Sequence, residues 1–344
     1  MDLLKRLSEA AGIPGHEGEI RRIISDELTG LVDEVEVDPL GNLITHKKGS
    51  GPVVLIAAHM DEIGFIVKHI EEETGFLRIH PLGGFDVKTL IAQRVVVHTG
   101  NGDLIGAIGS KPIHIMTEEE RKKLPEMKEL FVDLGLPADE VKERVSVGDP
   151  VTLRQDFVEL EEVVSGKALD DRAGVYIGIE AIKRAKEISC DLYFVGTTQE
   201  EVGLRGARVA GFVVNPRIGI ALDTTLAVDV PGVSAGERIT ALGKGVAIKL
   251  TDSASISHPG LVREMKRIAE ARKIPYQMEI LPRGGTDAGA IQLAQEGVAA
   301  ITLSLPTRYV HSVVETAHKA DLEAAIGLLA AFLEEAGSVD LSLS

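Results

Sequence analysis

The sequence predicts an α/β protein whose sheet domain is interrupted by an inserted all-β domain. Before residue 65 and after residue 163, apolar strand-like runs alternate with amphipathic helical patterns, which is typical of βαβ units. Between these positions the runs are short and alternate between apolar and polar residues, which is typical of a small barrel or sandwich. We therefore expect a discontinuous domain over residues 1–64 and 164–344 and an inserted domain over residues 65–163.

The composition indicates a large aliphatic core. Of the 344 residues, 44% are hydrophobic, whereas aromatic residues make up only 3% and tryptophan is absent. The net charge of −16, from 53 acidic and 37 basic residues, disfavours binding to nucleic acid and to anionic membranes. The single cysteine, Cys190, excludes a disulfide framework. The sequence also shows no secretory signal and no apolar run near the ~20 residues that span a bilayer, so we expect a cytoplasmic protein.

In the first segment we expect two helices, a hairpin and a buried strand. Helical periodicity covers residues 3–11 and resumes over residues 17–28, with a Gly- and Pro-containing break between them. Two alternating runs flank Pro39-Leu40-Gly41 and predict the hairpin. A fully apolar run then begins after Pro52 and ends at His59.

Five short runs predict the strands of the insert: FIVKHI, GFLRIHPL, QRVVVHT, DLIGAIG and DPVTLRQ. Turn signals such as Gly83-Gly84 and Asn101-Gly102 separate them. The charged segment Thr117–Met127 is best explained as a solvated loop or helix face.

In the last part of the chain, strands and helices alternate again. The expected helices cover residues 171–188, 259–272, 286–295 and 321–336. The expected strands cover residues 191–197, 217–222, 277–281 and 299–305.

Residues that can bind a metal follow four of the apolar strands, and a fifth precedes a helix. These candidates are His59 with Asp61, the pair Glu200 and Glu201, Asp223, His311, and Asp170 in KALDDRAG. In an α/β sheet, the carboxyl ends of parallel strands open onto one crevice, where ligands bind. Two imidazoles and several carboxylates are the donors that a pair of divalent ions needs.

The segment HMDEIGF suggests a ligand and its support. Side chains at i and i+2 of an extended segment share a face, so we expect the carboxylate of Asp61 to accept the free ring N–H of His59. Glu62 points the other way and is left unassigned. At the start of the next helix, capping and dipole compensation would need only one Asp. We therefore assign Asp170 as a bridging ligand and leave Asp171 or Arg172 for orientation.

The two adjacent glutamates after the strand DLYFVGT are costly to bury unless something neutralises them. Neighbouring extended residues point apart, so Glu201 would bind metal while Glu200 faces the substrate and takes a proton from water. A solvated acidic turn is the alternative. Taken alone, Asp223 could be a turn residue and His311 a core or turn histidine.

Six segments together resemble the tetrahedral (TET) or deblocking aminopeptidases, dinuclear metallopeptidases of clan MH. They occur in the order HMDEIGF, GKALDDRAG, QEEVGLRGA, ALDTT, GGTDA and PTRYVHS. The resemblance spans essentially the whole chain. It implies a three-layer α/β/α metallopeptidase domain, an inserted PDZ-like β-barrel dimerisation domain, and assembly into a hollow dodecamer built from dimers.

The resemblance also implies a site with two divalent ions, Zn²⁺ or Co²⁺, acting on peptide substrates. One ion would be bound by His59, Asp170 and Asp223. The second would be bound by Asp170, Glu201 and His311, with Asp170 bridging. Glu200 would be the general base and Asp61 would orient His59.

Two other functions are possible from the residues alone. A glycoside hydrolase would use paired carboxylates but would leave both histidines unexplained, and the lack of tryptophan disfavours a sugar-stacking cleft. A non-catalytic shell or peptide-binding protein would explain the insert but not the second glutamate. The sequence contains no HExxH, CxxC, GxSxG or GxGxxG motif, which disfavours several further enzyme classes.

Overall fold

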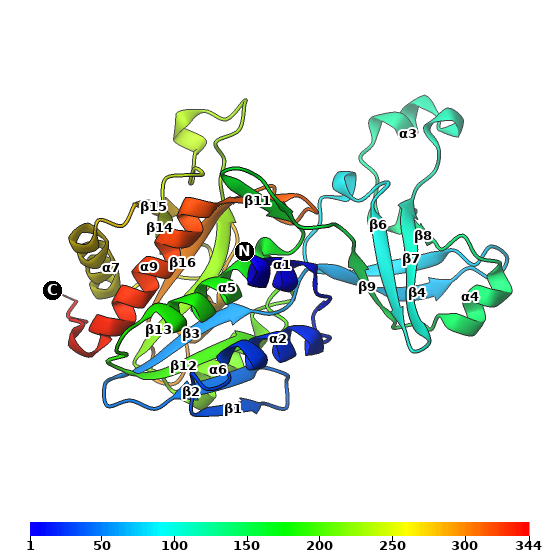
Figure 1. The fold of residues 1–344 in the computed structure, drawn as a ribbon. Coiled ribbons are helices and arrows are strands. Elements are labelled where there is room, and N and C mark those ends of the chain that lie inside the picture. Colours follow the sequence, from blue (N-terminus) through cyan, green and yellow to red (C-terminus); the bar gives the residue numbers. More distant parts are fainter. Residues whose placement is uncertain (344) are drawn as a thin grey trace.

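Among residues 1–343, which the computed structural model describes, eleven strands form one sheet at the centre of the main domain (Figure 1). Its four central strands are parallel and lie in the order β12, β3, β13, β16. Their bounds are Asp191–Thr197, Val53–His59, Ile218–Leu226 and Ala299–Arg308, respectively. Because these strands run the same way, the residues that follow them gather at one edge of the sheet.

Shorter strands extend the sheet on both sides. On the β12 side they are β2 (Leu43–Lys47) and β1 (Glu34–Val37). On the β16 side they are β14 (Val246–Thr251), β15 (Tyr276–Ile280), β17 (Glu315–His318), β11 (Val163–Gly166) and β10 (Val158–Glu159). The expected hairpin of β1 and β2 is confirmed by their antiparallel pairing.

Helices cover both faces of the sheet, so the main domain has the expected three layers. One face packs against α1 (Asp2–Glu9), α2 (Gly18–Leu28), α5 (Leu169–Arg184), α7 (Pro259–Arg272) and α9 (Lys319–Glu335). The other face packs against α6 (Arg205–Val214) and α8 (Asp287–Ile291). The two-residue period of a strand separates the faces: in β3, Ile56 joins the first core and Ala57 the second.

The insert is a closed antiparallel barrel that stands beside the main domain (Figure 1). Its strands are β4 (Gly64–Ile70), β5 (Leu77–Leu82), β6 (Arg94–Thr99), β7 (Gly102–Gly109), β8 (Phe131–Asp133) and β9 (Pro150–Leu153). The helices α3 (Glu118–Lys122) and α4 (Ala138–Arg144) lie between its later strands. Closure leaves the barrel without free strand edges.

The structure adds elements that the sequence patterns did not predict, namely the helices α4 and α6, the strands β8 and β14, and the short strands β10, β11 and β17. Strand β10 belongs to the large sheet, although it lies inside the range 65–163. As domain boundaries, 1–64, 65–163 and 164–344 stay predictions. No helix within residues 1–343 is long and apolar enough to cross a membrane.

Candidate metal centre

The residues expected at the strand ends do lie together at the carboxyl edge of the parallel sheet. His59 is the last residue of β3, and Asp223 lies in the second half of the neighbouring strand β13. The two glutamates follow β12 and His311 follows β16, both in turns. Side chains alternate between the two faces along a strand. By this alternation, His59 in β3 and Asp223 in β13 lie on the face that packs against α6 and α8, so both point to the same side of the sheet.

Asp170 lies between the two histidines. One of its carboxylate oxygens is 3.1 Å from Nε2 of His59, and the other is 3.4 Å from Nε2 of His311. Asp170 and Asp171 depart from helical geometry at the start of α5, and the peptide bond between them is cis. These two distances show that the oxygens of one carboxylate approach different imidazoles, which is the placement that a ligand shared by two ions needs.

The expected contact between Asp61 and His59 is wrong in one respect. Nδ1 of His59 lies 2.9 Å from the backbone carbonyl oxygen of Asp61 and 3.7 Å from its carboxylate. The reason is local: β3 ends at His59, so Asp61 lies outside the strand, where the i, i+2 rule no longer fixes the direction of its side chain. The backbone carbonyl therefore takes the ring N–H and sets the orientation of His59.

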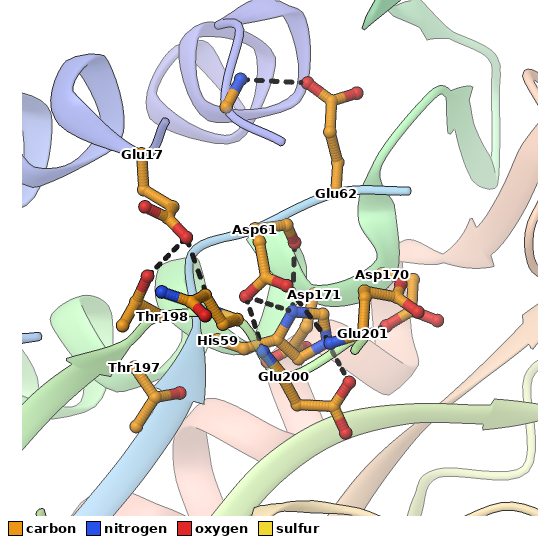
Figure 2. Close-up of polar contacts among 12 residues, drawn as sticks. Glu17, His59, Asp61, Glu62, Asp170, Asp171, Thr197, Thr198, Glu200 and Glu201 are labelled. Carbon is orange, nitrogen blue, oxygen red and sulfur yellow. Dashed lines mark hydrogen bonds and ion pairs between the residues drawn. The ribbon is translucent and has the colours of Figure 1, made fainter. Parts of the chain in front are cut away.

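The carboxylate of Asp61 instead holds the turn that carries the two glutamates (Figure 2). Its two oxygens accept hydrogen bonds from the backbone N–H groups of Glu200, at 3.0 Å, and Glu201, at 3.1 Å. Gln199 has a φ of 57°, so this segment is a turn and not the extended strand that the sequence suggested. Asp61 is fully buried beneath it.

Glu201 and Glu200 approach different histidines. Oε1 of Glu201 is 3.4 Å from Nε2 of His311, and Oε2 of Glu200 is 4.0 Å from Nε2 of His59. Oε1 of Glu201 is buried and has no hydrogen-bond partner among the described residues. A buried carboxylate oxygen without a donor is costly, so this atom fits a site for a cation.

Two overlapping groups of three residues bring their ligand atoms, one from each residue, within 4.8 Å of one another. The first group is His59, Asp170 and Asp223, and the second is Asp170, Glu201 and His311. A third group combines His59 with Glu200 and Glu201. Imidazole nitrogens and carboxylate oxygens at this spacing are suitable donors for divalent ions such as Zn²⁺, so the residues present fit a metal centre.

The protonation of these groups reflects a buried acidic cluster. Burial raises the pKa of Glu200 well above its ordinary value, and the nearby Asp223 adds to the rise. Burial and the Asp170 carboxylate likewise raise the pKa of Asp223. Although burial opposes it, the carboxylates of Asp170 and Glu201, each 3.4 Å from Nε2, raise the pKa of His311 to about 12. A divalent cation bound by His311 would therefore displace the proton that this imidazole holds at neutral pH.

Three further buried acids support the site, and sequence reasoning gave them no role. Glu315 accepts hydrogen bonds from the backbone N–H of Asp170, at 2.9 Å, and of His311, at 2.7 Å. Asp287 accepts a hydrogen bond from the Thr197 hydroxyl at 2.5 Å. Glu17 accepts from the hydroxyl of Thr198 (Figure 2). Only Asp287 had a sequence signal, because it lies in the GGTDA segment.

Glu62, left unassigned from the sequence, belongs to a buried ion-pair cluster behind the site. Its carboxylate lies 2.6 Å from Nζ of Lys167 and 3.6 Å from the guanidinium of Arg172. All three side chains are buried. Arg172 also donates to backbone carbonyl groups of the end of α1 and of the segment that links α1 and α2, so the cluster joins this part of the chain to the start of α5.

The candidate ligands line a cavity of about 490 Å³. Its floor contains His59, Asp170 and Asp223, with Glu200 and Glu201 beside them. The remaining wall comes from the end of β13, the segment 281–286 and Val310. The polar centre thus opens into a space that can receive a small side chain or the end of a peptide.

A sequence model described as M42 glutamyl aminopeptidase matches residues 41–328. A lysyl aminopeptidase of Pyrococcus furiosus is 39% identical over 347 residues, covering 99% of each chain.

Solved structures show the same fold. A TET aminopeptidase of a marine sediment Thaumarchaeota archaeon aligns with a TM-score of 0.94 at 39% identity, covering 97% of this chain and 95% of the other. The TET1 peptidase of Pyrococcus horikoshii, described as able to assemble into a tetrahedron or a large octahedral shell, aligns with a TM-score of 0.87 at 35% identity, covering 97% of this chain and 99% of the other. A Thermotoga maritima protein described as an endoglucanase aligns with a TM-score of 0.81 at 33% identity, over 97% of both chains.

Proposed function

Because the chain belongs to the M42 glutamyl aminopeptidase family, we propose that it is a metal-dependent aminopeptidase that removes the first residue from peptides. The observation that carries this proposal is the convergence of two histidines and three carboxylates on one cavity at the carboxyl edge of the sheet. Peptides whose free amino terminus enters this cavity would place their first peptide bond next to Glu200.

The ligand sets proposed from the sequence agree with the two groups of close donor atoms. His59, Asp170 and Asp223 would bind one divalent ion, and Asp170, Glu201 and His311 a second. Two such ions, Zn²⁺ or Co²⁺, would polarise the scissile carbonyl and hold the attacking water, as in other two-metal hydrolases.

Glu200 is the proposed general base. Its carboxylate, on a side chain that is 11% exposed, lies beside the ligands yet is not needed to complete either proposed set. It would take a proton from the attacking water and return it to the leaving amine. Asp61 would position Glu200 by accepting its backbone N–H, and would orient His59 through its own carbonyl oxygen.

We further propose that the chain assembles into a dodecamer built from dimers through its barrel. The supporting observations are the TET relatives and three exposed apolar side chains between β7 and β8, Ile113, Ile115 and Leu124. Exposed apolar side chains of this size favour contact surfaces between subunits.

A cytoplasmic location also stays a prediction.

The proposal is tested with peptides that carry a free or an acetylated amino terminus, followed by mass spectrometry over time. We expect stepwise loss of single residues from the free amino terminus in the presence of Zn²⁺ or Co²⁺, and no such loss after chelation. Carboxymethyl cellulose is included because one related protein is described as an endoglucanase, and we expect no cleavage of it. Internal fragments appearing before shortened peptides would contradict the proposal.

A further inference from the structure

A second cavity, of about 710 Å³, adjoins the candidate metal centre. It lies between the barrel segment 84–93 and the turn 309–314 that follows β16, shown in orange near the barrel in Figure 1. Val310 and His311 line both this cavity and the one that contains the candidate ligands. The two spaces therefore meet at a predicted metal ligand, and we call the second one the barrel groove.

The walls of the barrel groove are held against each other. Val313, from the turn, is only 7% exposed and belongs to the hydrophobic core of the barrel. On the barrel side, a Cβ atom added to Gly84 would lie 3.6 Å from Nδ1 of His311, so the backbone of the barrel segment is in contact range of that ring. The groove thus keeps a defined position relative to the centre.

Away from His311, the surface of the groove is uncharged in sum and partly apolar. Ile91, Tyr309 and Val314 are 38%, 55% and 44% exposed, which leaves their apolar atoms open to a ligand. The charged residues that line it, Asp86 and Lys88, neutralise each other through an ion pair of 3.1 Å. Such a surface suits a chain of varied side chains better than a charged ligand.

We infer that the barrel groove binds the part of a peptide substrate that follows the scissile bond. This inference rests on the proposed aminopeptidase function. The first residue of the peptide would occupy the cavity beside Glu200 and Asp223, so the second and later residues must continue past His311. The barrel groove begins at that residue and offers an apolar wall from Ile91 and Tyr309. The insert would then bind substrate directly, in addition to any role in assembly.

The test compares kcat/KM for a dipeptide and for a pentapeptide that begins with the same two residues. The quantity of interest is the ratio of the value for the pentapeptide to that for the dipeptide. In the unmodified protein we expect the longer peptide to be preferred. In Ile91→Asp we expect the ratio of the two values to fall about tenfold, the size expected for one lost aliphatic contact. Tyr309→Asn should also lower the ratio. Asparagine is chosen because it tolerates the φ of 60° at this position.

Ile256→Asp serves as the matched control, because Ile256 is 75% exposed and does not line the groove. An unchanged ratio in both groove variants would overturn the inference. An unchanged ratio together with a smaller particle in sedimentation would overturn it in favour of a second copy of the chain covering the groove. If the unmodified protein releases no amino-terminal residue from either peptide, the proposed function itself is wrong.

Discussion

The carboxylate of Asp61 holds the backbone of Glu200, with 3.0 Å between the oxygen and the amide nitrogen. The second oxygen of the same carboxylate holds the next amide, that of Glu201. One buried side chain thereby fixes the position of both the proposed base and a proposed ligand. The orientation of His59 depends on the same residue, but through its carbonyl oxygen.

We therefore expect Asp61→Asn to lower kcat about 10- to 100-fold, the cost typical of losing a group that supports metal ligands. An amide offers only one acceptor oxygen and would turn its NH₂ group toward a backbone N–H. Asp321→Asn is the matched control, because Asp321 is a buried carboxylate that also accepts two backbone amides, those of Gly243 and Gly245, away from the site. A normal kcat in Asp61→Asn would remove Asp61 from its proposed role.

Glu200→Gln separates the base from the ligands. The variant keeps the size of the side chain but cannot accept a proton, so we expect kcat to fall ~10²- to 10⁴-fold with the metal content unchanged. Glu201→Gln should instead lose metal, because Glu201 belongs to a proposed ligand set. The measurements are steady-state kinetics and elemental analysis of dialysed protein. Near-normal turnover by Glu200→Gln would exclude it as the base.

Metal binding should release protons. Although burial opposes it, the carboxylates of Asp170 and Glu201 raise the pKa of His311 to about 12, so this proposed ligand carries a proton at neutral pH in the metal-free site. We expect roughly two ions per chain and an affinity that increases with pH, because ions and protons compete for the same ligand atoms. Calorimetric titration in two buffers of different ionisation enthalpy measures the protons released. Binding without proton release would contradict this account of the site.

The metal-free protein should lose stability as the pH rises. Burial raises the pKa of Asp61 from 3.8 to about 7 and that of Glu315 from 4.5 to about 8. Above pH 4.5 the folded chain thus binds protons that the unfolded chain has released, and this contribution is lost as the pH passes through 7 and 8. We expect Tm to fall over this window, and to fall less in Glu315→Gln. A Tm that increases with pH in chelator-treated protein would show that other groups dominate.

Analytical ultracentrifugation tests the proposed assembly. We expect a particle much larger than one chain that retains activity on dilution, because the barrel exposes large apolar side chains such as Ile115, which is 66% exposed. A stable and fully active monomer at every concentration would refute the assembly. A dimer alone would support a contact through the barrel and exclude the dodecamer under those conditions.

The sequence predicted the convergence of the candidate site because that convergence follows from the sheet. Parallel strands bring their carboxyl ends to one edge, so His59, Asp223 and the residues after β12 and β16 had to lie near each other. Hydrophobic runs marked these strands clearly. Strand β14 was missed because Lys249 interrupts its apolar run, and the buried partners of this lysine, Asp252 and Glu279, are visible only in the fold.

Contacts between distant segments could not be predicted in the same way. Glu315 holds the backbone of Asp170, which is 145 residues away, and no local pattern distinguishes it from a surface glutamate. The partner of His59 was wrong for a different reason. The expected contact assumed that the strand continued past His59, whereas β3 ends there and the backbone carbonyl oxygen of Asp61 contacts the ring.

The burial of Val313 in the barrel core has a consequence for how this protein can change over evolution. The turn that carries His311 packs on a domain encoded more than 150 residues earlier, so the insert is not a free-standing module. A chimera that took its barrel from one relative and residues 309–315 from another would have to match the two at Val313. A substitution on one side of this contact should therefore favour compensating substitutions on the other side. The two segments should then covary among homologues.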